Sequence, residues 1–476
     1  MSITKDAGSR KDSKASIITT GKLEKPQERE ASGVYRDKVS WAAVFYKSIP
    51  DAVSLAGIKY AFNPREVRWR RILWLVLVAA GFGLMSYQTI ERCQFYFSRP
   101  MSVDVTVEYH RSVPFPSVAI CNVNAFKASL ISRTAVGRFL HDYSLSGRKA
   151  AERLAQVEAS RGILSRFNTS VLYQTFGHRL QDAIMFALWN GERLTMDNFT
   201  LKFTDWGLCF AFNDKENGLP PLRVSSYGMS YGLDVKLNVE QDEYFFQPQV
   251  RQGVGFQVML YDYGTEPLIE SDGFAVSVGT ETFIGAEIIE HHYKEAPEGD
   301  CKNKTLKYFD TYGHSECLLE CATDFYILHC NCSTIVKTEA PQCSIYKYLS
   351  CILPTHELFL QTAPCRCPRP CFSRRYSASV SSLKFPSSLW ANVYSGRFSE
   401  NASHFRENLC AMSVYMKDLS IRQVRQHLDY SFFSLLSDVG GALGLWLGGS
   451  VLTFFEVLDL IGHSAFVYTA RLSRRR

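Results

Sequence analysis

The stretch from Leu435 to Leu460 limits what this chain can fold into more than any other part of it. It is apolar over a length that enters a bilayer, which takes roughly 20 residues, yet it contains five glycines and the acids Asp438, Glu456 and Asp459. Intramembrane acids normally face protein or water, and a broken membrane helix is tolerated where its backbone lines a cavity. We therefore predict a pore-lining helix broken at 448–450, with Glu456 and Asp459 at its inner mouth. The alternative is a tightly packed anchor helix.

A second apolar run, Ile72 to Ile90, follows a basic segment. Residues 1–71 contain 15 Lys or Arg against 8 Asp or Glu, a net charge of 15 − 8 = +7, and the chain ends in Arg474-Arg475-Arg476. Basic flanks mark the cytoplasmic side of a span, and the mostly polar residues before the first run argue against a signal peptide. We predict two spans with both termini in the cytoplasm and residues 92–428 outside the cell.

The cysteines and glycosylation sequons fit this topology. Thirteen of the 14 cysteines lie between the spans, and the remaining one, Cys93, lies just past the first span. Dense cysteine in an extracellular region indicates a disulfide framework. The five Asn-x-Ser/Thr sequons, which accept N-linked glycans, also lie between the spans, at Asn168, Asn198, Asn303, Asn331 and Asn401.

The region between the spans mixes strand and helix patterns. Residues 103–109 and 408–418 alternate like strands, as do several shorter runs between 201 and 289. Residues 148–164 and 174–189 have helical spacing, so we predict an α+β domain with helices inserted between strands. Before the first span, residues 41–62 become amphipathic and aromatic, as in a helix at the inner membrane face.

Ten cysteines crowd into residues 301–371. Cys317 and Cys321 are four residues apart, so they would project from one helix face. Cys365 and Cys367 would face them from an extended chain, which suggests a disulfide ladder that staples a helical hairpin. A zinc knuckle is the alternative, but it needs reduced thiolates, which an extracellular region disfavours. The spacing by itself does not decide the pairing.

Taken together, the motifs resemble those of the epithelial sodium channel/degenerin superfamily, especially its acid-sensing and peptide-gated branches. The resemblance covers about residues 50 to 465. Its motifs occur here in the family's order, as Phe115-Pro-Ser-Val-Ala-Ile-Cys-Asn122, Cys209-Phe-Ala-Phe-Asn213, Gly232-Leu-Asp-Val-Lys-Leu-Asn-Val-Glu-Gln-Asp-Glu-Tyr244, Gly299-Asp-Cys301, Asp438-Val-Gly-Gly441 and Leu447-Gly-Gly-Ser450.

The resemblance implies a trimer of two-span subunits, each with a disulfide-rich, hand-shaped ectodomain of palm, β-ball, finger, thumb and knuckle. The domain limits that we expect are a cytoplasmic N-terminus at 1–71 with a re-entrant segment near 50–60, a first span at 72–91, an ectodomain at 92–428 with its finger near 123–200 and thumb near 300–371, a second, pore-lining span at 429–467 and a cytoplasmic tail at 468–476. The implied disulfides are Cys121–Cys209, Cys301–Cys371, Cys317–Cys367, Cys321–Cys365, Cys330–Cys351 and Cys332–Cys343, which leave Cys93 and Cys410 unpaired.

The resemblance also implies roles for individual pore residues. Backbone and hydroxyl oxygens at the helix break would replace part of an ion's hydration, and acids at the inner vestibule would concentrate cations. The positions matched in this way are the selectivity filter Gly448, Gly449 and Ser450, the gate Ser437, Asp438 and Gly441, the inner vestibule Glu456 and Asp459, and the re-entrant motif Ala56 and Gly57.

Several residues depart from the family's pattern. Ala56 replaces the histidine of the family's His-Gly motif, which bears on the open probability, and Gly449 replaces the commoner alanine in the filter, which bears on the strength of sodium selectivity. Leu208 replaces a lysine of the acid-sensing branch, which weakens the case for proton gating. The palm–thumb aromatic pair reads Arg99 and Glu298, which suggests an ion pair at the wrist; a double-mutant cycle on gating that shows no coupling would exclude it. An exposed pair of this kind contributes only about 0–1 kcal/mol.

We therefore expect a sodium-selective, amiloride-sensitive channel of the plasma membrane, gated by an extracellular ligand, with a neuropeptide as the leading agonist. Protons, bile-acid-like amphiphiles and mechanical load are the alternatives. The expected partners are two further subunits, the same or homologous, the ligand and membrane lipid, but no nucleic acid. No cofactor or metal is expected besides permeant Na+. A disulfide-rich adhesion or receptor protein is the alternative of a different class, and an enzyme is disfavoured because no motif places a nucleophile beside a base.

Overall fold

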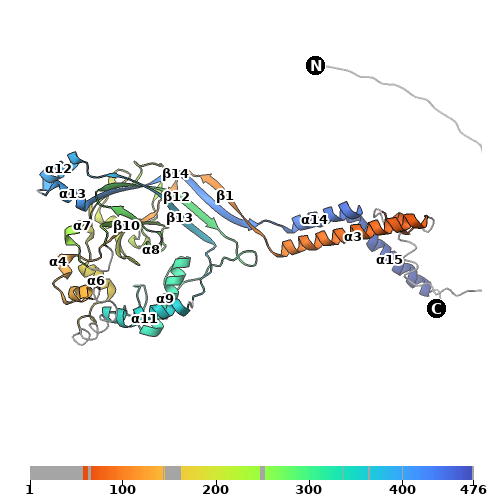
Figure 1. Ribbon diagram of the computed structural model, residues 1–476, viewed down its shortest axis with the longest axis horizontal. Helices are drawn as coiled ribbons and strands as arrows, with labels where there is room; N and C mark the ends of the chain where they lie inside the picture. The colour runs from red at the N-terminus through yellow and green to blue at the C-terminus, as the bar shows by residue number, and fades with distance from the viewer. Residues whose placement is uncertain are drawn as a thin grey trace, which may run out of the picture. The chain divides into compact units, whose positions relative to one another are not determined.

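The computed structural model describes residues 57–62, 66–142, 144, 162–246, 252–335, 337–362, 365–398 and 400–473. Its chain divides into two compact units, one of Met1–Glu91 with Leu436–Arg476 and one of Arg92–Leu435. The larger unit contains the strands, and the smaller one contains most of the long apolar helices (Figure 1).

A seven-stranded sheet is the frame of the larger unit. Its strands are β13 (Phe372–Lys384), β12 (Thr280–His292), β14 (Leu409–Leu428), β9 (Gly232–Asn238), β4 (Ile184–Trp189) and β5 (Glu192–Arg193) in this order, with β1 (Met101–Tyr109) paired to β14. Strand β9 alternates buried apolar residues with more exposed polar ones, as a strand with one covered face does. Residues 103–109, which the sequence predicted as a strand, lie in β1.

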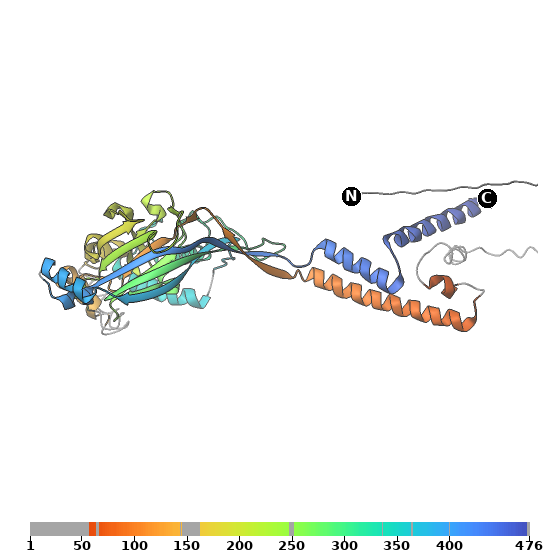
Figure 2. The same ribbon diagram turned by 90° about the horizontal axis from the view of Figure 1, so that it is seen from above.

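Strand β14 joins two parts of this sheet because it is 20 residues long. Its first part pairs antiparallel with β9, from Leu409 to Tyr415, and its last part pairs antiparallel with β1, from Ser420 to Leu428. Strand β12 runs parallel to both parts, and the register shifts between Ala286 and Ile288. One continuous strand therefore connects the two halves of the sheet, as Figure 2 shows from above.

A five-stranded sheet covers part of this frame. It consists of β11 (Phe274–Ser277), β10 (Gly255–Tyr261), β3 (Ser117–Asn122), β7 (Gly207–Phe212) and β6 (Phe199–Thr204), and a short pair, β2 (Val113–Pro114) and β8 (Arg223–Val224), lies apart from it. Every residue of β3 is buried. Phe115, Phe212 and Phe256 belong to one core cluster with residues of both large sheets, so the two sheets share a hydrophobic core.

The helices of the larger unit lie in three groups. The first contains α4 (Ala128–Ile131), α6 (Thr169–Phe176) and α7 (Leu180–Ala183); the second contains α9 (His314–Cys330), α10 (Ile345–Lys347), η4 (Tyr348–Ile352) and α11 (Leu353–Thr362); the third contains α12 (Ser388–Phe398) and α13 (Ala402–Asn408). Helix α6 begins where the Asn168 side chain accepts a 2.8 Å hydrogen bond from the Val171 N–H. The first group packs around a small apolar core that also includes Ile345 of α10, and the second group has a further small core.

The helix predicted for residues 174–189 is wrong. Helix α6 ends at Phe176, α7 is four residues long, and Ile184–Trp189 form strand β4 instead. The apolar spacing that suggested a helix places Ile184 and Ala187 in the core between the sheets, where pairing with β9 satisfies their backbone. Most of the other predicted helix, 148–164, lies outside the described residues.

The smaller unit contains α2 (Ile58–Phe62), most of α3 (Arg68–Phe97) and α14 (Phe432–Leu447), and all of α15 (Val451–Ser473). Among the described residues, α3 is the one helix that by itself is long and apolar enough to cross a membrane. Helices α14 and α15 pass the same test together, as a pair bent by 75°. The helix at the first predicted span, 72–91, thus extends beyond it at both ends.

Candidate functional site

The second apolar helix is interrupted at Gly448, Gly449 and Ser450. Gly448 has φ = 61°, a left-handed conformation that ends a helix readily because glycine has no Cβ. Its N–H donates to the Gly444 carbonyl at 3.0 Å, and the Gly449 N–H reaches back to the Leu443 carbonyl at 3.2 Å. The Ser450 N–H then donates to Thr453 Oγ1 at 3.1 Å, one residue before α15 begins. The predicted filter residues are therefore the non-helical link of the bent pair.

The predicted gate residues lie on α14. Ser437 and Gly441 are exposed and four residues apart, so they share one face of the helix, while Asp438 is half-buried. Helix α15 carries the predicted vestibule acids, of which Glu456 is half-buried and Asp459 exposed. The roles of these residues in gating and cation attraction stay predictions.

Helices α3 and α14 touch through main-chain atoms. A Cβ built on Gly81 would lie 2.8 Å from the Trp446 carbonyl oxygen, closer than real Cβ atoms come. About two turns further along α3, the Trp446 indole N–H donates to Gln88 Oε1 at 3.0 Å. Small residues permit such close helix contacts in membranes. This contact is not visible in the sequence, where Gly81 and Gly83 look alike.

Gly57 of the predicted re-entrant motif is held in a conformation suited to glycine. It has φ = +86°, and a Cβ there would lie 2.8 Å from Trp74 Cε3 and 3.0 Å from Val78 Cγ2. Its carbonyl accepts hydrogen bonds from the Tyr60 and Ala61 N–H groups and so begins α2. Ala56, the other residue of the motif, lies outside the described residues.

The predicted wrist residues lie in two connecting segments of the larger unit. Arg99 lies between α3 and β1 with φ = 50°, and Glu298 lies in the loop after β12. The Glu298 carboxylate is 3.8 Å from the Lys294 ammonium, and the ion pairs of the described residues do not include Arg99 with Glu298. Coupling between Arg99 and Glu298 stays a prediction.

Six disulfide bonds join the pairs that the family resemblance implies. They are Cys121–Cys209, Cys301–Cys371, Cys317–Cys367, Cys321–Cys365, Cys330–Cys351 and Cys332–Cys343. Cys410 is a buried free thiol and Cys93 a half-buried one. Cys317 and Cys321 project from α9 toward the extended segment that contains Cys365 and Cys367.

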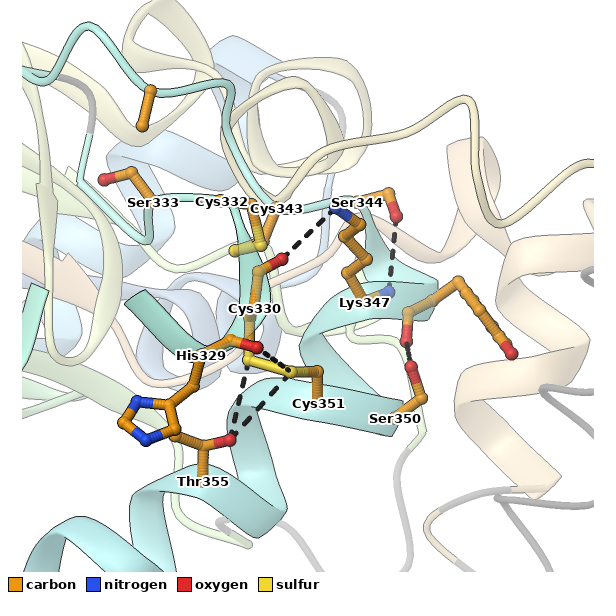
Figure 3. The surroundings of a disulfide bond; sticks show 12 residues. His329, Cys330, Cys332, Ser333, Cys343, Ser344, Lys347, Ser350, Cys351 and Thr355 are labelled. Atoms are coloured by element: carbon orange, nitrogen blue, oxygen red, sulfur yellow. Dashed lines mark hydrogen bonds between the residues drawn. A yellow bond between two sulfur atoms is a disulfide. The ribbon is translucent and has the colours of Figure 1, made fainter. Parts of the chain in front are cut away.

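Two disulfide bonds and a lysine hydrogen bond hold the C-terminal end of α9, as Figure 3 shows. Cys330 and Cys332 form disulfides with Cys351 and Cys343, and the Lys347 ammonium donates to the Cys330 carbonyl at 3.2 Å. A cation there is favourable because the helix dipole places partial negative charge at that end. The sequon residue Asn331, at φ = 51°, ends the helix between the two bridged cysteines.

The other sequons differ in exposure. Asn303 and Asn401 are exposed like Asn331, whereas Asn168 and Asn198 are half-buried. Asn168 uses its side-chain oxygen to cap α6, which leaves its nitrogen, the atom that carries a glycan, outside that hydrogen bond. All five stay predicted glycosylation sites.

Sequence reasoning missed a group of charged residues where α9 begins. Lys202, Asp214, Glu216, Glu266, Glu316 and Lys337 lie close together there. They come from five separate segments of the chain and form no motif, so no local signal in the sequence marks them.

Comparison with known proteins identifies the family. The family described as amiloride-sensitive sodium channel matches residues 51–460. Acid-sensing ion channel 1 of Gallus gallus is 27% identical over 454 residues, which covers 91% of this chain and 86% of that protein. Acid-sensing ion channel 2 of Homo sapiens is 28% identical over 430 residues, covering 86% of this chain and 84% of that protein. Acid-sensing ion channel 1A of Danio rerio is 29% identical over 432 residues, covering 86% of each.

Proposed function

The chain belongs to the amiloride-sensitive sodium channel family, and on that premise we propose that it forms a trimeric, sodium-selective cation channel opened by an extracellular ligand. The observation that carries the proposal is the helix break between α14 and α15. An anchor helix has no use for a 75° bend in the middle of an apolar pair, whereas non-helical backbone at membrane depth is tolerated where it lines a water-filled path.

Each part of the bent pair then has a role. The filter is the link Gly448–Ser450, where backbone and hydroxyl oxygens replace part of the hydration shell of Na+. Ser437, Asp438 and Gly441 form the gate, since small side chains allow three helices to approach one another. Glu456 and Asp459 raise the local cation concentration at the inner mouth.

The assembly follows from the same premise. Two further subunits, the same or homologous, complete the pore, and lipid surrounds the spans. The basic flanks support a topology with both termini in the cytoplasm, and the disulfides support a location of the larger unit outside the cell at the plasma membrane.

A neuropeptide is the leading agonist, because residues that mark the acid-sensing branch are replaced here, among them the position now held by Leu208. Gating by protons is the second candidate, and the names of the acid-sensing relatives favour it. Voltage clamp of oocytes that express the chain separates the two. We expect a sodium current that amiloride blocks and that peptides, rather than acid steps, elicit.

Two outcomes would change this assignment. A current that acid steps alone elicit would establish proton gating. Surface expression without any current under peptides, acid, bile acids or pressure would favour the adhesion or receptor alternative. Surface biotinylation in the same cells distinguishes a silent channel from one that fails to reach the membrane.

A further inference from the structure

The start of α9 meets the five-stranded sheet through charged side chains. Among the described residues, the core cluster around α9 contains no residue of that sheet, and the sheet's own clusters contain no residue of 301–371. Polar contacts cross this boundary instead, so apolar packing does not fix the position of α9 against the sheet. We call Lys202, Asp214, Glu216, Glu266, Glu316 and Lys337 the charged joint.

Lys202 is the buried centre of the joint. Its side chain, on β6, is 4% exposed, and its ammonium lies 3.1 Å from Asp214 and 3.4 Å from both Glu216 and Glu266. Burial alone would lower the pKa of this ammonium, but Glu266 and Asp214 outweigh it and raise the pKa. Asp214 also accepts a 2.6 Å hydrogen bond from the Tyr261 hydroxyl. Lys202 and its three carboxylates all belong to the sheet side of the joint.

Lys337 contributes a second ammonium from the other side. It lies in the loop after α9, 2.8 Å from the Glu266 carboxylate and 3.1 Å from that of Glu216. Its ammonium also lies 5.6 Å from the centre of the Phe309 ring. Lys337 therefore shares two carboxylates with Lys202 and ties the disulfide-rich segment to the sheet.

Glu316 adds a buried carboxyl group in the first turn of α9. The Glu266 N–H donates to its Oε1 at 2.8 Å, and the residue is 4% exposed. Burial raises the pKa of this carboxyl, and the Glu266 charge acts in the same direction while Lys202 opposes it. If every member of the charged joint is ionised, its four carboxylates and two ammonium groups leave an excess of two negative charges. Nearby, Lys215 pairs with Asp310 at 2.7 Å on the exposed rim.

We propose that Lys337 is a positioning residue for gating: by pairing with Glu216 and Glu266 it lets the Glu316 carboxyl group at the start of α9 lie against the sheet, and it thereby sets the resting position of the thumb. The proposal rests on the proposed channel function for its consequence, but the contact itself does not. Without the ammonium, Glu216, Glu266 and Glu316 would repel one another with only Lys202 between them, and α9 would separate more readily from the sheet.

Hydrogen exchange of the full-length protein in lipid nanodiscs tests the contact. In Lys337→Gln we expect protection factors at residues 313–321 to fall about two- to five-fold at neutral pH, the range for one partly exposed ion pair. Lys337→Arg should restore protection. The matched control is Lys302→Gln, which removes an exposed lysine of the same segment that takes part in none of the ion pairs among the described residues.

One further result separates an electrostatic role from general loosening. Protection should return at neutral pH in the double variant Lys337→Gln, Glu316→Gln, because the second substitution removes one of the negative charges that the missing ammonium leaves unbalanced. Unchanged protection in Lys337→Gln, or a loss that the second substitution does not repair, would overturn the proposal.

Current recordings address the consequence for gating. If the chain carries a ligand-gated current, Lys337→Gln should shift the half-maximal agonist concentration and Lys337→Arg should not. A shift that Lys302→Gln produces equally would overturn the gating role. If no variant, nor the unaltered chain, carries a current, the channel proposal fails while the exchange experiment still decides whether Lys337 positions α9.

Discussion

The backbone carbonyl of Trp446 occupies the space that a side chain on Gly81 would need. A Cβ at Gly81 would lie 2.8 Å from that oxygen, whereas a Cβ at Gly83 would meet nothing within 4 Å. The contact between α3 and α14 thus depends on a missing side chain at one of two glycines in the same helix.

Gly81→Ala should destabilise the protein, because α14 must move away from α3 to admit the methyl group. We expect a cost of about 1–3 kcal/mol, the usual range for overpacking. Gly83→Ala is the matched control and should be neutral or slightly stabilising, since alanine favours helix over glycine. Thermal unfolding followed by size-exclusion chromatography compares the two. Equal unfolding temperatures for both variants would contradict the contact.

Gly57→Ala should lower channel open probability. Alanine disfavours the φ of +86° by about 1–2 kcal/mol, and its methyl group would also press on Trp74. Single-channel recording at matched surface expression measures the effect. The control is Gly462→Ala in α15, where a Cβ meets nothing within 4 Å. An open probability that Gly57→Ala leaves unchanged would argue against a role for α2 in gating.

A cysteine at Ser437 should react with a charged thiol reagent and change the current, because this exposed position belongs to the proposed gate. Leu436→Cys is the control: it lies next along α14, rotated by about 100° around the helix axis, and is also exposed. Current through the Ser437→Cys channel should change irreversibly, and current through the Leu436→Cys channel should change less or not at all. Identical responses at both positions would remove Ser437 from the gate.

Acid should weaken the contact between β9 and the α4–α7 region. The Glu240 carboxylate lies 2.9 Å from His178 and 2.6 Å from Lys127, and although burial opposes it, these partners lower the pKa of Glu240. A carboxyl group whose pKa is lower in the folded protein stabilises the fold at pH values above its pKa in the unfolded chain, which is near 4.5. This stabilisation is lost as the pH falls through the lower pKa of the folded protein.

Glu240→Gln should therefore reduce stability by about 1–2 kcal/mol at neutral pH, as expected for hydrogen bonds to a charged group. The deficit should shrink as the pH falls below about 4.5 and vanish once the pH is below the lowered pKa of Glu240 in the folded protein. Unfolding temperatures measured from pH 3 to pH 7 provide the comparison, with the exposed Glu192→Gln as control. A deficit that persists unchanged at pH 3 would show that the Glu240 charge is not its cause.

Local patterns predicted the strands where alternation was strong. Residues 103–109 lie in β1, and all of 408–418 except Asn408, which ends α13, lie in β14, because an alternating segment can bury one face only as a strand. The same reasoning failed at Ile184–Trp189. There the choice between helix and strand depends on the partner β9, nearly fifty residues away in sequence, and periodicity carries no information about a distant partner.

The candidate pore was accessible to sequence reasoning for a different reason. Glycines, a serine and acids inside an apolar run are costly in a membrane, so their presence already indicates a use. The charged joint has no such contrast with its surroundings. Lys202 is one lysine among many between the two predicted spans, and its burial among Asp214, Glu216 and Glu266 becomes visible only when the chain is folded.

The length of β14 limits how movement can pass along it. Sliding a strand by one residue against β9 or β1 would turn every side chain to the opposite face of the sheet, so a graded displacement along the strand is forbidden. Bending is the motion left, and the register shift between Ala286 and Ile288 on the neighbouring β12 is where the hydrogen-bond ladder is already interrupted. We therefore expect β14 to bend at one place, beside this register shift. A movement at one end of the strand would then reach the other end as a change in the angle of the strand.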